Sequence, residues 1–114
     1  MLYTSCAFDP EEPKNYKIDG NYYASIDVNA PNYGVMIIYS ENEGKSGEEL
    51  IQHCVSIYRG NKKIIFSANL FYDTTDITYY SINVDSAVDH PKKISAAIFK
   101  KQIRNLELVQ IKTK

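Results

Sequence analysis

Apolar and polar residues alternate along most of the chain with the two-residue period of β-strands. Residues 22–28 have one apolar and one mostly polar face, which predicts a half-exposed strand. Residues 33–40 are apolar on both faces, which predicts a strand inside a sheet. Between a short strand at 16–18 and the strand at 22–28, the sequence Asp19-Gly20-Asn21 has the composition of a tight hairpin turn.

The same alternation predicts strands in the second half of the chain. Residues 62–72 are apolar on both faces near their start, which indicates a central strand, and a polar turn at 73–76 leads into another strand at 77–85. Shorter alternating stretches at 2–8 and 106–111 predict a first and a last strand.

Residues 47–59 instead show the features of an amphipathic helix. Ser46 and Glu49 have the spacing of a capping box, and Gly60 can take the left-handed turn that often ends a helix. Leu50, Cys54 and Ile57 recur at three-residue and four-residue intervals, as the buried face of a helix requires. We therefore expect a helix from about residue 47 to residue 59.

A second helix is expected after His90, with Pro91 in its first turn, where the missing N–H costs little. Taken together, the elements predict an α+β fold with an antiparallel or mixed sheet of about six strands and two helices packed on one face. The order corresponds to two ββα-like units plus terminal strands, in a single domain spanning residues 1–114.

Composition narrows the class of protein. A chain of 114 residues can bury one core without metal or disulfide support. It has no apolar run long enough to span a membrane, and its first residues lack the features of a signal peptide, so we expect a cytoplasmic protein with no membrane association. Cys6 and Cys54 are then expected to be buried thiols that act as small hydrophobic side chains.

The net charge of −1 hides an asymmetry along the chain. Residues 1–49 carry nine acidic and three basic side chains, a net charge of −6, whereas residues 50–114 carry five acidic and ten basic ones, a net charge of +5. This distribution predicts one acidic and one basic surface, provided that the two halves are not interleaved in space.

The sequence offers little support for catalysis. His53 and His90 have no recognised spacing to a nucleophile or to metal ligands, and the segment Gly44-Lys45-Ser46-Gly47 lacks the spacer of a phosphate-binding loop. We predict no catalytic residues, no cofactor and no metal site. Whether the protein is an enzyme stays open, and the sequence favours a non-enzymatic role.

The leading hypothesis is a protein-binding or inhibitor protein, of the kind represented by bacterial toxin immunity proteins or phage-encoded antagonists. Ten tyrosines in a short chain favour a binding surface, and acidic loops would speed association with a basic partner such as a nuclease or toxin. The contact residues predicted are Glu11, Glu12, Glu41 and Glu43 in the loops and Tyr23 and Tyr79 on the sheet. Homodimerisation through an exposed strand edge is also expected to be feasible.

The alternative hypothesis is a nucleic-acid or nucleotide binding protein. Lys93, Lys100 and Arg104 would fall on one face of the second predicted helix, where they could contact several phosphates. Because a lysine-rich outer face is common in solvated helices, nucleic acid ranks below a protein partner.

Overall fold

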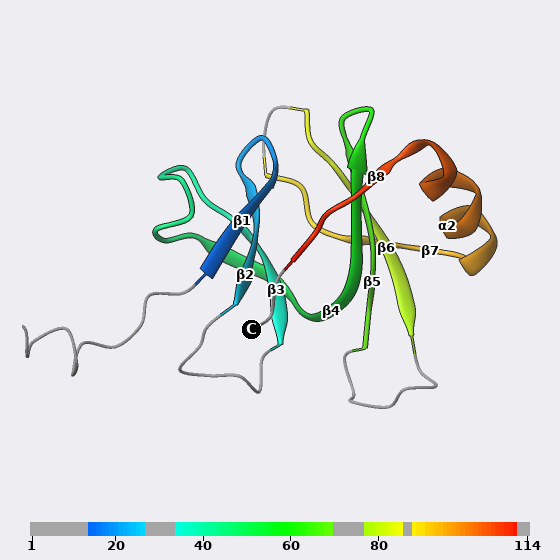
Figure 1. The fold of residues 1–114 in the computed structure, drawn as a ribbon, viewed down its shortest axis with the longest axis horizontal. Coiled ribbons are helices and arrows are strands. Elements are labelled where there is room, and N and C mark those ends of the chain that lie inside the picture. Colours follow the sequence, from blue (N-terminus) through cyan, green and yellow to red (C-terminus); the bar gives the residue numbers. More distant parts are fainter. Residues whose placement is uncertain (1–13, 27–33, 70–76, 86–87, 112–114) are drawn as a thin grey trace, which may run out of the picture.

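The computed structural model describes residues 14–26, 34–69, 77–85 and 88–111. Within these residues the chain forms eight strands, one α-helix and one short 3-10 helix (Figure 1). The elements in chain order are β1 (Lys14–Asp19), β2 (Tyr22–Ile26), β3 (Val35–Tyr39), β4 (Glu48–Gly60), β5 (Lys63–Ala68), β6 (Thr78–Asn83), β7 (Lys92–Ile94), α2 (Ala96–Gln102), η2 (Ile103–Asn105) and β8 (Glu107–Leu108).

The strands form one antiparallel sheet in which β1 to β7 are neighbours in chain order, and β8 pairs with β4. The predicted strands at 22–28, 33–40, 62–72 and 77–85 correspond to β2, β3, β5 and β6 over their described residues. Strand β2 is buried on both faces and not half-exposed as predicted. The predicted hairpin turn is confirmed, because β1 and β2 are joined through Gly20, whose φ is 56°. The strand predicted at 2–8, like Cys6, lies outside the described residues.

Strand β4 connects the two halves of the sheet. Its first half pairs with β3 and its second half with β5, and the strand changes direction between them (Figure 1). The register shifts show one extra residue in β4 at each of three places: between Glu49 and Ile51, between Ile51 and Cys54, and between Cys54 and Ser56. Each extra residue is a β-bulge, which bends a strand and increases its twist.

The helix predicted at 47–59 is therefore wrong, and the bulges explain why. An unbroken strand would point every second residue inward, but each bulge adds one residue to this interval. As a result Ile51, Cys54 and Ile57, which all pack against the same core, recur every third residue. That spacing is also the spacing of a buried helical face.

The bend lets the two halves of the sheet enclose one core. Ala24 of β2 and Ile37 of β3 come from the first half, and Ile64 and Phe66 of β5 come from the second half; all four have 0 % exposure. Phe66 also stacks on Tyr80 of β6, with ring centroids 5.2 Å apart. The core is thus formed between two layers of sheet and not between a sheet and helices.

Helix α2 packs on the outer surface of β5 and β6. It begins after Ser95, whose hydroxyl accepts from the N–H of Ile98, and its buried residue Phe99 lies against the rings of Tyr58 and Tyr79. The helix predicted from Pro91 is therefore shorter than expected, because β7 occupies 92–94 and pairs with β6.

The predicted fold class of about six strands with two packed helices is wrong. The described chain is mostly an antiparallel sheet of eight strands with a single short α-helix. No helix among the described residues has the length and apolar composition needed to cross a membrane.

One arginine ties three strands together. Arg59 of β4 donates from Nη1 to the carbonyl oxygens of Lys17 and Ile18 in β1, at 3.0 Å each, and from Nε to Glu107 Oε1 in β8 at 3.1 Å. The guanidinium group therefore joins β1, in the first half of the sheet, to β4 and β8.

Candidate functional site

The strongest concentration of acidic side chains in the described chain lies at the connection from β3 into the start of β4. We call residues 41–49 the acidic loop; they include Glu41, Glu43, Glu48 and Glu49 against one cation, Lys45, a net charge of −3. All five side chains are exposed. Figure 1 shows this loop and helix α2 toward opposite ends of the long axis.

The acidic loop is held in one conformation by hydrogen bonds from short polar side chains. The buried hydroxyl of Ser40 accepts from the N–H of Gly44 at 2.9 Å and donates to Asn42 Oδ1 at 2.7 Å. Asn42 in turn accepts from the N–H of Ser46 at 3.0 Å and donates to the Ser46 hydroxyl at 2.9 Å. Asn15 of β1 donates to the carbonyl of Gly44 at 2.6 Å, which fixes the loop to the sheet.

Two glycines allow the backbone conformation of the acidic loop. Gly44 has a φ of 87°, a left-handed conformation that favours glycine, and follows Glu43 with a φ of 64°. At Gly47 a Cβ atom would lie 2.3 Å from the carbonyl oxygen of Tyr39, so any side chain would displace the backbone. The segment that resembles part of a phosphate-binding loop is thus a rigid turn between two strands.

A shallow cleft of about 370 Å³ runs beside the acidic loop. Its lining includes the carboxylates of Glu41 and Glu48 and the phenol of Tyr39, whose hydroxyl lies 3.5 Å from Glu41 Oε2. Two carboxylates beside an aromatic ring suit a cationic side chain, which gains from both charge attraction and contact with the ring face.

The predicted contact residues are only partly brought together. Glu41 and Glu43 lie in the acidic loop, whereas Glu11 and Glu12 lie outside the described residues. Tyr23 is buried at 8 % exposure against Met36 and Ile38, and the Tyr79 ring lies 4.5 Å from Phe99 under helix α2. Neither tyrosine therefore lies at the acidic loop.

The sequence analysis missed two residues of the cleft. It placed Tyr39 within the strand predicted at 33–40 inside the sheet, and it placed Glu48 in the helix predicted at 47–59. The edge-to-face contact of Tyr39 with Tyr22, at 5.3 Å between ring centroids, leaves one side of Tyr39 in the cleft. A signal was present in the sequence, because four glutamates follow Tyr39 in a segment that is also rich in Asn, Gly and Ser.

The residues of the nucleic-acid alternative do not share one helix. Lys93 lies in β7 opposite Tyr80, Lys100 lies on α2 and Arg104 lies in η2. The prediction that one helical face carries all three is wrong, because the helix begins at Ala96. Lys100 and Arg104 still belong to a basic end of the molecule.

His90, His53 and Cys54 lie in different surroundings. His90 Nε2 lies 3.2 Å from Glu48 Oε2 on the surface, and His53 takes a φ of 59° at the bend of β4. Burial raises the pKa of the Cys54 thiol, which disfavours the reactive thiolate. Within the part of the chain that the structure describes, no group of three His, Cys, Asp or Glu residues is placed to hold a metal ion.

Asp89 has a structural role. Its carboxylate accepts from the N–H of Asn83 at 2.9 Å and pairs with Lys92 at 3.3 Å, while its own N–H donates to the Tyr22 hydroxyl at 2.7 Å. The hydrogen bond from Asn83, with a smaller contribution from Lys92, lowers the pKa of Asp89 despite some desolvation. The residue fixes the segment between β6 and β7 to the core.

Comparison of the chain with protein-family models, curated proteins and solved structures found no match.

Proposed function

We propose that the protein is a non-enzymatic binding protein that inhibits a basic partner protein through its acidic loop, as toxin immunity proteins and phage-encoded antagonists do. The observation that carries the proposal is a rigid loop with a net charge of −3 beside a cleft that fits a cationic side chain. A basic nuclease or toxin has the complementary charge.

The carboxylates at the centre of the loop are available for such a partner. Among the described residues, no cation lies within ion-pair distance of Glu41 or Glu43. A partner lysine or arginine would therefore form a new ion pair without breaking one between two described residues. Exposed charge of one sign also steers association and makes the association rate sensitive to salt.

The rigidity of the loop supports the same role. Ordering a flexible loop on binding costs free energy for each side chain that is fixed, and this cost is reduced when the loop is already held in place. The hydrogen bonds from Asn15, Ser40 and Asn42 hold the acidic loop before any partner arrives.

The test is affinity capture from host lysate after nuclease treatment, followed by measurement of binding to the captured protein. We expect Glu41→Gln combined with Glu43→Gln to weaken binding at least tenfold at low salt, because rim charges of this kind contribute mainly through association. The matched control is Ala96→Lys with Ala97→Lys, which changes the net charge by the same amount on exposed positions of α2.

A loss of affinity in the loop variant and not in the helix variant would support the acidic loop as the contact. Equal losses in both variants would show that only net charge matters and would contradict the proposal. Homodimerisation stays a prediction that light scattering can test. Among the described strands, β1 and β7 are the two edge strands of the sheet order. Two carbonyl groups of β1 already accept hydrogen bonds from Arg59.

A further inference from the structure

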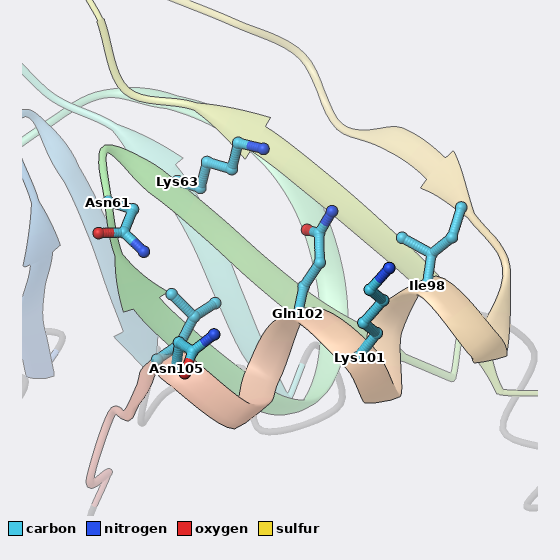
Figure 2. A pocket seen from close by; sticks show the side chains of 7 residues that line it. Asn61, Lys63, Ile98, Lys101, Gln102 and Asn105 are labelled. Carbon is cyan, nitrogen blue, oxygen red and sulfur yellow. The ribbon is translucent and has the colours of Figure 1, made fainter.

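A second cleft, of about 410 Å³, lies at the other end of the molecule between the β4–β5 hairpin and helix α2. We call it the hairpin cleft. The hairpin supplies Asn61 and Lys63, and the helix supplies Lys101 and Gln102 (Figure 2). Leu106 also lines the cleft. Figure 2 shows Lys63 on the hairpin side and Lys101 on the helix side, with Gln102 between the two lysines.

We propose that the hairpin cleft binds a nucleoside monophosphate. This inference goes beyond the proposed function, because it uses different residues at the opposite end of the molecule from the acidic loop.

The charge of the cleft selects an anion. The lining residues, all from the described part of the chain, include two lysines and no carboxylate. Across residues 14–26, 34–69, 77–85 and 88–111, no acidic side chain lies within ion-pair distance of Lys63 or Lys101. A phosphate monoester carries about two negative charges at neutral pH, which matches two ammonium groups.

The neutral groups of the cleft select a molecule larger than phosphate. Asn61, Gln102 and Asn105 carry primary amides, each with two donors and an acceptor, and such amides can form paired hydrogen bonds with the edge of a base. Ile98 is 44 % exposed beside them, although it is a large apolar side chain. Ile98 and Leu106 each add apolar surface to the lining, against which part of a base can pack.

The walls of the cleft are fixed to each other. A Cβ atom on Gly60 would lie 2.9 Å from Leu106 Cδ2, so the hairpin and the segment after α2 are in close contact. Tyr58 and Arg59 of the same hairpin pair with Leu108 and Glu107 of β8. The cleft is therefore formed before a ligand binds, and its volume lies in the range of about 300–1,000 Å³ that small-molecule sites occupy.

The proposal can be tested by calorimetry and by amide chemical shifts with adenosine 5′-monophosphate, the other three common nucleoside monophosphates, adenosine and inorganic phosphate as probes. We expect at least one monophosphate to bind and to shift the amides of residues 61–63 and 98–106. Lys63→Ala and Lys101→Ala should each weaken this binding about tenfold, because each removes one charged contact.

The matched control is Lys100→Ala. It removes the same charge from the same helix, and Lys100 does not line the cleft. Binding in this variant should stay within about twofold of the unmodified protein, since only long-range charge is lost.

Three results would overturn the proposal: no binding of any monophosphate at millimolar concentration, an equal loss in the Lys100 control, or inorganic phosphate binding as tightly as every monophosphate. Adenosine binding as tightly as its monophosphate would equally remove the role of the lysines. The Glu41→Gln, Glu43→Gln variant should bind nucleotide unchanged, so failure here leaves the partner-binding proposal to be judged by its own experiment.

Discussion

Replacement of Arg59 tests whether the two halves of the sheet are held together by a guanidinium bridge. In Arg59→Ala, the carbonyl groups of Lys17 and Ile18 each lose a charged donor at 3.0 Å, and Glu107 loses its partner at 3.1 Å. The two carbonyl contacts are worth about 1 to 1.5 kcal/mol each when the donor is charged and partly solvated. The ion pair adds at most about 0.5 kcal/mol, because the side chain of Glu107 is 70 % exposed.

The expected loss for Arg59→Ala is therefore about 2 to 3.5 kcal/mol in the free energy of unfolding. Arg59→Lys keeps the charge and most of the aliphatic stem, but an ammonium group cannot reach three acceptors in the geometry of a guanidinium fork, so we expect a loss of about 1 to 2 kcal/mol. Glu107→Gln removes only the exposed ion pair and should cost less than about 0.5 kcal/mol.

Urea unfolding monitored by circular dichroism measures these differences. The urea concentration at the midpoint should be highest for Glu107→Gln, lower for Arg59→Lys and lowest for Arg59→Ala. The dependence of the free energy of unfolding on urea should stay constant, because a constant slope indicates a change in stability and not in the unfolded state. In thermal unfolding, each 1 kcal/mol should lower the Tm by about 4 °C. If Glu107→Gln destabilised the protein as much as Arg59→Ala, the ion pair and not the carbonyl bridge would be the main contribution, and the reasoning would be refuted.

Three other substitutions test separate features. Gly47→Ala places a Cβ atom 2.3 Å from the Tyr39 carbonyl oxygen, so we expect the connection between β3 and β4 to shift. The free energy of unfolding in urea should fall by about 2 kcal/mol, and partner binding should weaken. Unchanged stability and affinity would contradict the loop geometry. Asp89→Asn removes a carboxylate whose pKa is lowered mainly by the N–H of Asn83. The stabilisation by this carboxylate is present above its unfolded pKa of about 4 and is lost as the pH falls through its lower folded pKa. The variant should therefore be about 1 kcal/mol less stable than the unmodified protein at pH 7, and this difference should become smaller in acid. A constant difference between pH 7 and pH 2 would argue against this origin. Phe99→Ala should lower the free energy of unfolding by about 3 kcal/mol, because Phe99 is 7 % exposed and anchors the only α-helix among the described residues. Amide hydrogen exchange should increase in residues 96–105 before it increases in the sheet. Equal increases in the helix and in the sheet would contradict a helix that is held by this one ring.

Much of the sheet could be predicted from local sequence. The alternation in residues 22–26, 35–39, 63–68 and 78–83 gives strands, because side chains of a strand point to opposite faces at every second residue. Gly20 marks a tight turn for a local reason too, since its positive φ suits a residue without a Cβ atom. The acidic side chains of residues 41–49 can likewise be identified from the sequence alone.

Strand β4 shows where local sequence is insufficient. The interval of three between Ile51, Cys54 and Ile57 fits both a helix and a bulged strand, and the choice depends on hydrogen bonds to β3 and β5, which are distant in the chain. Ser46 has the same ambiguity: its hydroxyl could cap a helix, but in the folded chain it accepts from Asn42 instead. Local signals of helix formation are weak compared with the burial of a strand between two partners.

Both clefts were also decided by tertiary structure. The cleft at the acidic loop needs Tyr39 beside Glu48, and the hairpin cleft needs Lys63 beside Lys101, which is 38 positions later in the chain. The sequence determined that the first half of the chain is acidic and the second half basic. Only the bend of β4 and the packing of Phe99 on the sheet determined which of these charges face a common space, because side chains far apart in sequence meet only when the core that lies between them is formed.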